Sequence, residues 1–277
     1  MTDLHLHTTA SDGRCTPREL VERVAAAGVT VMAVTDHDTT ASVTEVQTRA
    51  AGCGIEALAG IEVTAAENGR DVHVLGYFLD PQEAKLNEFL RLQRARRVER
   101  VRMIAARLAE LGVPIDLQSL LDQGTRDGNR SIGRPQVARA LQRAGHVADT
   151  KEAFDRFLGA GRPAFVSRQG SPTEIVIGII HGAGGIASLA HPGRTRLDSR
   201  IEALALSGLD AIEVYHSDHD DAAIERYRRM ASGLGLLITG GSDFHGDPTH
   251  GIEPGASTLP AEEWQRLSAA RHRHASR

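Results

Sequence analysis

The sequence predicts an α/β fold, a barrel of about seven strands with a helical insertion. Strand-like apolar runs alternate with helix-like segments before residue 82 and after residue 165, and the stretch 82–165 between them contains no convincing strand. Most of the apolar runs end in His, Asp or Glu, and a parallel αβ barrel builds its active site at the carboxyl ends of its strands. These observations predict a barrel domain of residues 1–81 and 166–277 and a helical insertion of residues 82–165 that covers the mouth of the barrel.

The composition excludes several classes of protein. A chain of 277 residues with 41% hydrophobic and 25% charged residues is typical of an ordinary globular protein. The net charge of −4 gives no general attraction to nucleic acid or membrane, and two cysteines exclude a disulfide scaffold or a cysteine-type zinc site. Without an apolar run of about 18 residues or a secretory signal, we expect a cytoplasmic protein.

The first predicted strand leads into His5 and His7. Side chains two residues apart on a strand point to the same face, so both imidazoles can reach one ion. The Ser-Asp-Gly sequence that follows is typical of a turn, which can bring Asp12 back over the strand end. A His-x-His pair alone is a weak signal, and it gains weight here because later strands repeat the design.

The next segments continue the strand–helix alternation. Thr16, Pro17 and Gly28 are the expected N-cap, first residue and stop of a helix. The continuous apolar run 29–34 is typical of a strand buried on both faces and leads to His37. A helix over 40–51 follows.

Two further strands supply one more carboxylate and one more imidazole. The segment 55–63 carries Glu62 near its end, and the segment 71–78 alternates in polarity and contains His73. We expect these strands to pair with each other and His73 to face the same pocket as Glu62.

The pattern then changes to helices. The segment 83–111 predicts one long helix with an apolar stripe and arginine-rich outer faces. Shorter helices are expected near 116–122, 135–144 and 151–158. An arginine-rich helix face is more often solvated than a nucleic-acid groove, and with only 4% aromatic residues we expect no broad base-stacking surface.

The strand–helix rhythm resumes after the insertion. A helix over 171–181 precedes a strand over 185–190 that ends in His191, and a strand over 210–215 ends in His216 and His219. A helix over 221–232 leads to a strand over 236–239, after which come Asp243 and His245. The tail from residue 271 is expected to be a frayed end.

The strand ends predict a metal cluster. Many imidazoles and carboxylates in one place would be costly to bury without cations. Their number exceeds the needs of one ion, so two or three divalent ions fit better, and mixed nitrogen and oxygen ligation suits Mn²⁺, Zn²⁺ or Fe²⁺. Asp36 and Asp38 are expected to hydrogen-bond ligands rather than bind metal. The candidate ligands are His5, His7, Asp12, His37, Glu62, His73, His191, Asp243 and His245.

These motifs, in this order, resemble the PHP (polymerase and histidinol phosphatase) family over nearly the whole chain. The resemblance implies a distorted (β/α)7 TIM-like barrel with a trinuclear metal site, in which Mn²⁺ is the expected ion. It implies that His5, His7, Glu62 and Asp243 hold one metal, and that Glu62 bridges to a second metal shared with His73 and His191. The third metal would be held by Asp12, His37 and His245.

Within this family, the helical insertion and the stretch 212–219 resemble phosphoesterases that convert nucleoside 3′,5′-bisphosphates to nucleoside 5′-monophosphates. Relatives in that group also trim short RNA from the 5′ end. Arg134 at a helix start, Ser167 and Arg168 at the exit of the insertion, and Arg194 after His191 are candidate substrate-binding residues. For each arginine a surface ion pair has at least even odds. His216 or His219 is the candidate proton donor to the leaving oxygen.

Other functions stay open at this stage. A histidinol-phosphate phosphatase of the same family is the second reading, and a metal-stabilised binding module without catalysis is the least favoured. A polymerase-associated nuclease is disfavoured because the chain has no polymerase region. A C–N hydrolase is disfavoured because both lysines lie in the insertion. The expected partner is a phosphorylated small molecule such as a nucleotide, or short single-stranded RNA, with no membrane and no obligate protein partner.

Overall fold

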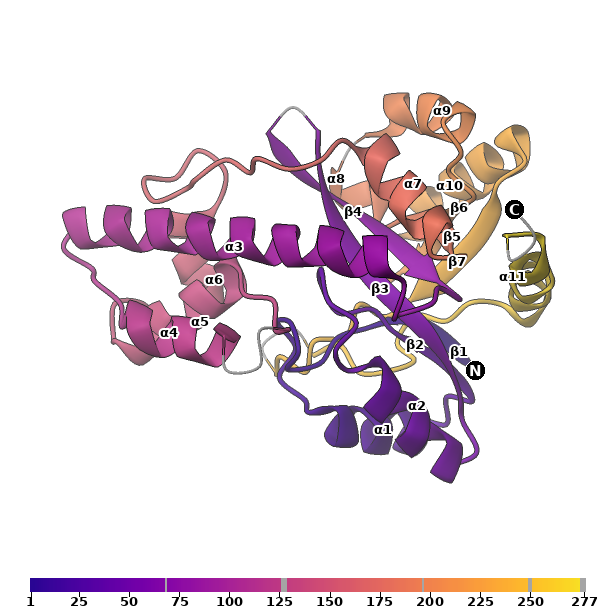
Figure 1. Cartoon of the computed structure of the whole chain (residues 1–277), viewed down its shortest axis with the longest axis horizontal. Coiled ribbons are helices and arrows are strands. Elements are labelled where there is room, and N and C mark those ends of the chain that lie inside the picture. Colours follow the sequence, from indigo (N-terminus) through magenta and orange to yellow (C-terminus); the bar gives the residue numbers. More distant parts are fainter. Residues whose placement is uncertain (68, 126–128, 196, 249–250, 275–277) are drawn as a thin grey trace.

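The computed structural model describes residues 1–67, 69–125, 129–195, 197–248 and 251–274 (Figure 1). In these ranges, seven strands form one sheet whose order follows the chain. The strands are β1 Thr2–Leu6, β2 Val31–Val34, β3 Glu56–Glu67, β4 Arg70–Tyr77, β5 Ile186–Leu189, β6 Ala211–His216 and β7 Leu237–Gly241.

The sheet curls into a distorted barrel. Strands β1, β2 and β3 are parallel, and so are β5, β6 and β7, whereas β4 runs antiparallel to both of its neighbours. A bridge between Leu6 and Phe244 brings the last strand segment back to the first, and the His7 N–H donates to the Phe244 carbonyl at 2.9 Å. The predicted distorted TIM-like barrel is therefore confirmed, and the reversed β4 is the source of its irregularity.

Helices cover the outside of the barrel (Figure 1). The helices α1 Pro17–Ala26 and α2 Val43–Gly52 pack beside β1 and β2, and α7 Thr173–Gly182 and α10 Asp221–Leu234 cover later strands. Thr16 caps α1, and a capping box with Glu19 satisfies the first free N–H groups of the helix. This packing fixes the strands and hence the positions of their ends.

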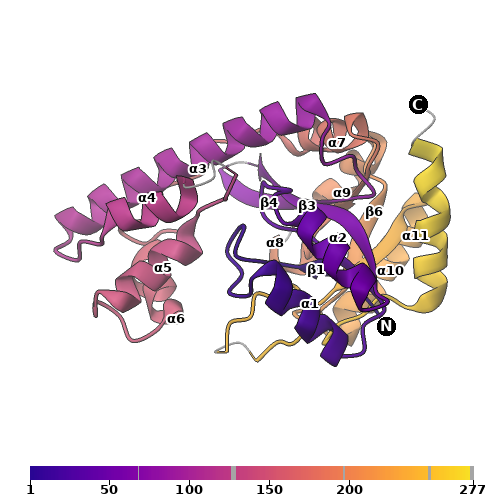
Figure 2. The same cartoon turned by 60° about the horizontal axis from the view of Figure 1, so that its bottom comes forward.

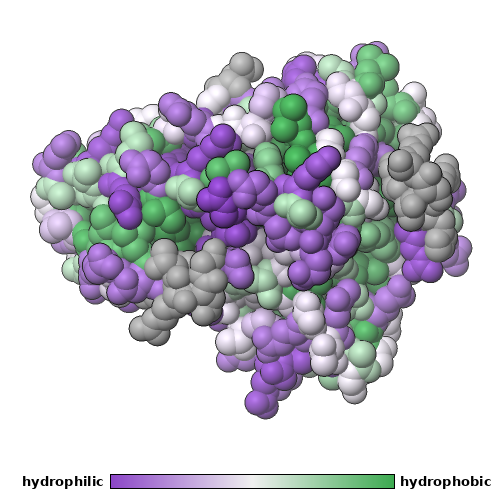
Figure 3. Space-filling view, viewed as in Figure 1, coloured by the Kyte–Doolittle hydropathy of each residue, from purple (hydrophilic) through white to green (hydrophobic). Residues whose placement is uncertain are grey.

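Residues 84–158 form a group of helices beside the barrel (Figure 2). They are α3 Ala84–Glu110, α4 Leu117–Thr125, α5 Arg134–Arg143, α6 Thr150–Ala153 and a π-helical turn, η1 Phe154–Leu158. Val101, Ile104, Val137 and Leu158 are among the residues of a hydrophobic cluster that these helices build largely among themselves. Hydrophilic side chains lie over the middle of α3 in the view of Figure 3. The division into a separate insertion domain of residues 82–165 stays a prediction.

Three helices were not expected from the sequence: α8 Pro192–Thr195, α9 Asp198–Leu206 and α11 Ala261–His274. The expectation of a frayed tail from residue 271 was wrong, because α11 continues to His274. Leu267 and Ala270 of α11 are buried in the main core, and the Trp264 ring stacks on Phe78 at 6.2 Å. Apolar residues at spacings of three thus anchor this helix to the barrel. None of the helices in the described ranges is long and apolar enough to cross a membrane.

Candidate active site

The structure brings all nine candidate ligands together at one end of the barrel. His5 lies on β1, Glu62 on β3 and His73 on β4, and the other ligands follow strands or occupy the adjoining loops. His5, His7 and Glu62 are fully buried and form the base of the cluster. A cavity of about 690 Å³ opens above it and is lined by Asp12, His37, Glu62, His73, His191, Asp243 and His245.

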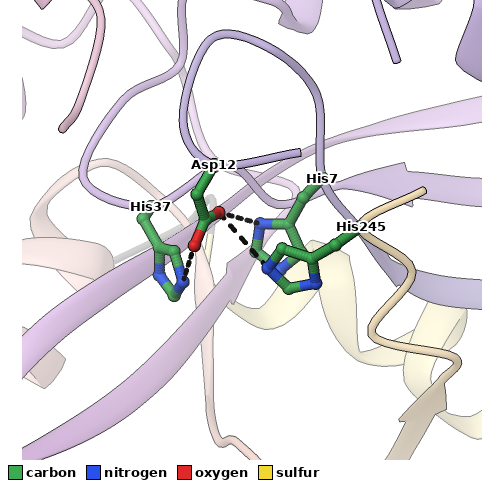
Figure 4. Close-up of side chains that lie close together, drawn as sticks. All are labelled: His7, Asp12, His37 and His245. Atoms are coloured by element: carbon green, nitrogen blue, oxygen red, sulfur yellow. Dashed lines mark ion pairs between the residues drawn. The ribbon is translucent and has the colours of Figure 1, made fainter. Parts of the chain in front are cut away.

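The loop after β1 carries Asp12 into the cluster. The Asp12 carboxylate lies between three rings: Oδ1 is 3.2 Å from His245 Nε2 and 3.9 Å from His7 Nδ1, and Oδ2 is 3.6 Å from His37 Nε2 (Figure 4). Gly13 permits this turn, because a Cβ there would lie 2.6 Å from the His7 backbone.

Asp36 holds the same loop from below. Its carboxylate accepts hydrogen bonds from the Thr8 N–H at 2.8 Å, the Thr8 hydroxyl at 2.6 Å and the Ser11 hydroxyl at 2.6 Å. A carboxylate with this many donors supports the loop and is not free to bind metal, as expected. The expectation that Asp36 and Asp38 hydrogen-bond the ligands was wrong, because Asp36 accepts from Thr8, Ser11 and Ser42 and Asp38 from Arg97 and the Thr64 N–H.

Glu62 is the centre of the cluster. Its Oε2 lies 3.3 Å from the Nε2 atoms of His5 and His7, and 3.0 Å from His37 Nδ1. Its Oε1 lies 2.7 Å from His73 Nδ1 and 3.1 Å from His191 Nε2. One carboxylate thus faces five imidazoles, and Glu62 belongs to two of the residue groups that could hold an ion.

Asp243 completes the deep part of the cluster. Its Oδ1 lies 3.3 Å from His5 Nε2 and 3.2 Å from His7 Nε2. Asp243, His191 and Asp38 have positive φ angles of 57°, 27° and 52°. Non-glycine residues in this conformation cost about 1–3 kcal/mol each and persist where the surroundings determine them, so backbone strain is concentrated at this site.

The unsatisfied atoms of the cluster fit divalent cations. Among the residues that the structure describes, buried atoms without a hydrogen-bond partner include His5 Nε2, both ring nitrogens of His7, His37 Nδ1 and Glu62 Oε2. Leaving such atoms unsatisfied costs about 1–3 kcal/mol each. Two sets of four residues have donor atoms within 4.8 Å of one another and could each hold an ion: His5, His7, Glu62 and Asp243, and His7, Asp12, His37 and His245.

The electrostatics of the cluster favour cations as well. Burial by itself would raise the pKa of Glu62 and Asp243, but the surrounding histidines, first among them His37 for Glu62 and His5 for Asp243, hold the pKa of both carboxyls well below the usual range. Burial lowers the pKa of His37 to about 3 and of His191 to about 4, despite the nearby Glu62. Burial would also lower the pKa of His5 and His7, but Glu213 and Asp243 hold the pKa of His5 well above its usual value, and hydrogen bonds to Asp243 and Glu62 raise that of His7 to about 10. Ionised carboxylates and the neutral His37 and His191 are in the states that metal binding requires, and a bound cation would displace the protons of His5 and His7.

Glu213 supports the cluster and was missed as a functional residue in the sequence. It is fully buried on β6; its Oε1 lies 2.8 Å from His5 Nδ1, and its Oε2 accepts the His191 N–H at 2.7 Å. A carboxylate on the second nitrogen of a ligating imidazole fixes the ring and its tautomer. A charged residue inside the apolar run 211–215 was the signal that could have revealed it.

His216 and His219, the candidate proton donors, are held by hydrogen bonds inside the fold. His216 Nδ1 accepts the Asp218 N–H at 3.0 Å, and its Nε2 lies 3.3 Å from Asp243 Oδ2. His219 Nδ1 lies 2.9 Å from the Val214 carbonyl, and its Nε2 accepts the Gly193 N–H at 3.2 Å. Neither ring lines the cavity. As placed, His219 has no ring nitrogen left for a substrate.

One wall of the cavity is formed by four arginines and Asp71, with Asp38 buried behind them. Asp71 accepts from Arg134 at 2.9 Å and Arg100 at 3.1 Å, and its Oδ1 lies 3.4 Å from Arg168 Nε. Arg97 pairs with Asp38 and also donates to the Thr64 hydroxyl at 2.7 Å. Four guanidinium groups and two carboxylates leave an excess of two positive charges. We call this set the arginine cluster: Arg97, Arg100, Arg134, Arg168, Asp38 and Asp71.

Only part of the arginine cluster was expected. Arg134 and Arg168 were predicted and line the cavity, whereas Arg97 and Arg100 belong to the α3 face that was expected to be solvated. Their spacing of three residues, which places them on one helix face, was the available signal. Arg194 also lines the cavity and lies 3.1 Å from Asp243 Oδ2. Ser167 is exposed, lies next to Gly69 and does not line the cavity.

A seven-stranded barrel with clustered histidines and carboxylates at its strand ends defines a barrel protein built to hold divalent metal ions. The PHP domain model matches residues 3–160. The chain belongs to the PHP domain family, which confirms the resemblance.

Curated relatives match almost end to end. The chain is 35% identical over 278 residues to a 3′,5′-nucleoside bisphosphate phosphatase of Chromobacterium violaceum, covering 96% of each protein. It is 35% identical over 248 residues to a 5′-3′ exoribonuclease of Haemophilus influenzae, covering 88% of this chain and 89% of the relative.

Solved structures agree with the fold. A Chromobacterium violaceum protein described as an amidohydrolase, with bound sulfate and no metal, superposes with a TM-score of 0.86 at 34% identity, over 97% of this chain and 96% of that one. A Bifidobacterium adolescentis protein described as a metal-dependent phosphoesterase superposes with a TM-score of 0.87 at 33% identity, over 96% and 94%.

Proposed function

We propose that the protein is a metal-dependent phosphoesterase that removes the 3′-phosphate of nucleoside 3′,5′-bisphosphates to give nucleoside 5′-monophosphates, and that it also accepts short 5′-phosphorylated RNA. One observation carries the proposal: a single cavity joins the histidine–carboxylate cluster to the arginine cluster. The relatives described as a nucleoside bisphosphate phosphatase and as an exoribonuclease support the same substrate class.

The arginine cluster suits the second phosphate of such a substrate. A phosphate monoester carries a charge of about −1.5 to −2 at pH 7, which matches the excess of two positive charges. Arginine binds phosphate with paired N–H groups, and Arg134 and Arg168 both face the cavity. The 5′-phosphate would therefore sit among the arginines while the 3′-phosphate lies over the histidine–carboxylate cluster. Ser167 is not proposed as a substrate-binding residue, because it lies outside the cavity lining.

The nine candidate ligands would hold three divalent ions, with Mn²⁺ favoured over Zn²⁺ or Fe²⁺. His5, His7, Glu62 and Asp243 would hold the first ion, and Glu62 would also face a second with His73 and His191. Asp12, His37 and His245 would hold the third. Bound divalent ions activate water, neutralise phosphate oxygens and stabilise a leaving oxygen.

The side chains of the protein bind the substrate and supply the proton for the leaving oxygen. The arginine cluster orients the substrate by its 5′-phosphate, and Arg194 at the edge of the metal cluster can neutralise charge on the reacting phosphate. The P–O3′ bond breaks as water adds to phosphorus, and the departing 3′ oxygen takes a proton. Of the two predicted donors, His216 fits this role better, because its Nε2 lies 3.3 Å from Asp243 Oδ2 at the cluster, although its ring lies behind the cavity lining.

The test is phosphate release by the Mn²⁺-loaded protein from adenosine 3′,5′-bisphosphate, with histidinol phosphate and adenosine 3′-monophosphate measured alongside. We expect the bisphosphate to be preferred by about 100-fold in kcat/KM, equivalent to about 2.7 kcal/mol. Arg134→Ala should remove much of the preference over adenosine 3′-monophosphate, which lacks the 5′-phosphate. A preference for histidinol phosphate would contradict the proposal, and so would equal rates for the bisphosphate and the 3′-monophosphate.

A further inference from the structure

A second cavity of about 270 Å³ lies between the loop after β1 and the helices α4 and α5. It is adjacent to the first cavity, because Arg14, Ile132 and Arg139 line both. Arg139 also links it to the candidate metal site, since its Nη1 donates to the Asp12 carbonyl at 3.0 Å. The second cavity therefore lies next to the path of a molecule that extends past Asp12 from the first.

The lining of the second cavity favours an anion. Arg14, Arg130 and Arg139 contribute guanidinium groups, and no carboxylate lines the cavity in the part of the chain that the structure describes. Arg14 is paired with Asp247 of the first cavity, whose Oδ2 lies 2.6 Å from Nη2. Arg130 is exposed and lines this cavity but not the first.

One polar group in the wall lacks a partner. Ser131 is only 2% exposed, and its N–H donates to the Ala10 carbonyl at 2.9 Å. Its hydroxyl is buried and has no hydrogen-bond partner among the described residues. A buried hydroxyl without a partner is unfavourable, so a polar ligand in this cavity would stabilise the protein by giving it one.

The rest of the wall is apolar. Leu120 and Ile132 present aliphatic side chains, and no aromatic residue lines the cavity within the described ranges. A base packed here would contact surfaces that do not distinguish one base from another. The volume is below the ~300–1,000 Å³ of pockets that hold drug-sized ligands, which suits a single nucleotide unit.

We infer that the second cavity receives the nucleotide that follows the scissile phosphate when the substrate is a short RNA. The inference rests on the proposed function, which places the 5′-phosphate in the arginine cluster and the reacting phosphate at the candidate metal site. The remainder of the strand then leaves past Asp12, where Arg139 and Arg130 meet its next phosphate and Leu120 and Ile132 contact its base. A mononucleotide bisphosphate leaves this cavity empty, so changes in the cavity should affect RNA cleavage but not bisphosphate hydrolysis.

The experiment compares Arg130→Ala and Ser131→Ala with wild type, on adenosine 3′,5′-bisphosphate and on a 5′-phosphorylated adenosine trinucleotide. Because a charged hydrogen bond is worth roughly 1.5–3 kcal/mol, we expect Arg130→Ala to lower kcat/KM for the trinucleotide by about 10- to 100-fold. Ser131→Ala should lower it by a smaller factor. Both variants should hydrolyse the bisphosphate at the wild-type rate. Arg143→Ala, at the exposed end of α5 and outside both cavities, is the matched control.

Binding of a fluorescent 5′-phosphorylated trinucleotide to metal-free protein gives a readout independent of turnover. Arg130→Ala should reduce the slope of log affinity against log salt by about one. The inference is wrong if wild type hydrolyses the bisphosphate but Arg130→Ala leaves trinucleotide cleavage and binding unchanged. It is also wrong if Arg130→Ala lowers kcat/KM for both substrates by the same factor. If wild type fails on the bisphosphate itself, the proposed function fails, and the inference fails with it.

Discussion

The two walls of the main cavity are ligand sites of opposite character. The histidine–carboxylate cluster lies on the barrel strands and contains buried atoms that face one another without forming hydrogen bonds. The arginine cluster lies between α3, α5 and the barrel, and Asp38 and Asp71 there accept formed hydrogen bonds. The first set is short of positive charge, and the second has two positive charges in excess.

This difference teaches what each wall needs. The protons on the imidazoles cannot provide every buried nitrogen and carboxylate oxygen of the first wall with a hydrogen bond. Bound cations would therefore complete the first wall. The guanidinium groups of the second wall are already paired in part with carboxylates. An anion would neutralise their remaining charge but is not required for folding. We therefore expect metal removal to change the first wall strongly, and loss of a carboxylate to change the second.

The largest effect is expected from Glu62→Gln. Glu62 faces five imidazoles, and an amide would remove the charge around which they are arranged. Outer-shell changes cost roughly 10- to 100-fold in metal affinity, so a central carboxylate should cost more than this. Metal content after dialysis and Mn²⁺-dependent phosphate release are the measurements. Glu56→Gln, exposed at the first residue of β3, should match wild type. Retention of all metal by Glu62→Gln would refute the central role of Glu62.

The next effect is expected from Asp71→Asn in the arginine cluster. Burial would raise the pKa of Asp71, but Arg168, Arg100 and Arg134 hold that pKa far below its usual range. Removing one partner of a buried ion pair costs about 3 kcal/mol, which should appear in the free energy of unfolding at pH 7. Inorganic phosphate should restore part of the loss, because it can bind the released guanidinium groups.

The pH dependence sharpens this test. A depressed folded-state pKa stabilises the fold above the unfolded value of about 3.9, and the stabilisation is lost as pH falls through that value toward the folded-state pKa. The stability difference between wild type and Asp71→Asn should therefore be constant from pH 5 to 8 and shrink below pH 4. Asp155→Asn, in an exposed pair with Lys151, should leave stability near that of wild type at any pH. If the stability difference between wild type and Asp71→Asn were unchanged at pH 3, the stabilisation would not come from ion pairs of the Asp71 carboxylate.

A smaller effect is expected from Glu213→Gln. The carboxylate of Glu213 orients His5 and accepts the His191 N–H, and glutamine keeps the size but not the charge. Metal affinity should fall by about 10- to 100-fold, measured by titration with Mn²⁺, while turnover at saturating metal stays near wild type. Glu225→Gln on the exposed face of α10 is the control. A turnover loss that excess metal does not restore would show that Glu213 acts on the reaction itself.

The same comparison explains what could be predicted from the sequence. The ligands of the first wall lie on or just after strands, and strand periodicity places neighbouring ligands such as His5 and His7 on one face. Their chemistry is rare enough in strands to be noticed. The barrel itself follows from the same periodicity and from its helix caps, such as Thr16.

The second wall could not be predicted in the same way. Arg97 reaches Asp38 across 59 positions of the chain, and the helix pattern alone does not say which polar face of α3 meets the barrel. The docking of α11 through Leu267 is another long-range contact of this kind. Local pattern identifies an element, whereas the partner of its polar face depends on packing between distant segments.

The smallest effect is expected from His219→Asn. This variant tests whether the imidazole takes part in the reaction or only holds the loop that carries His191. His219 connects the Val214 carbonyl to the Gly193 N–H, next to the loop that carries His191. Burial lowers the pKa of His219, so the ring is neutral at pH 7 and both nitrogens stay engaged. Loss of these hydrogen bonds should cost about 1–2 kcal/mol of stability, measured by chemical denaturation, with kcat for the bisphosphate within about threefold of wild type. A large fall in kcat together with the loss of one limb of the pH–rate profile would instead identify His219 as a proton donor, and the ring would then have to leave its hydrogen bonds to act.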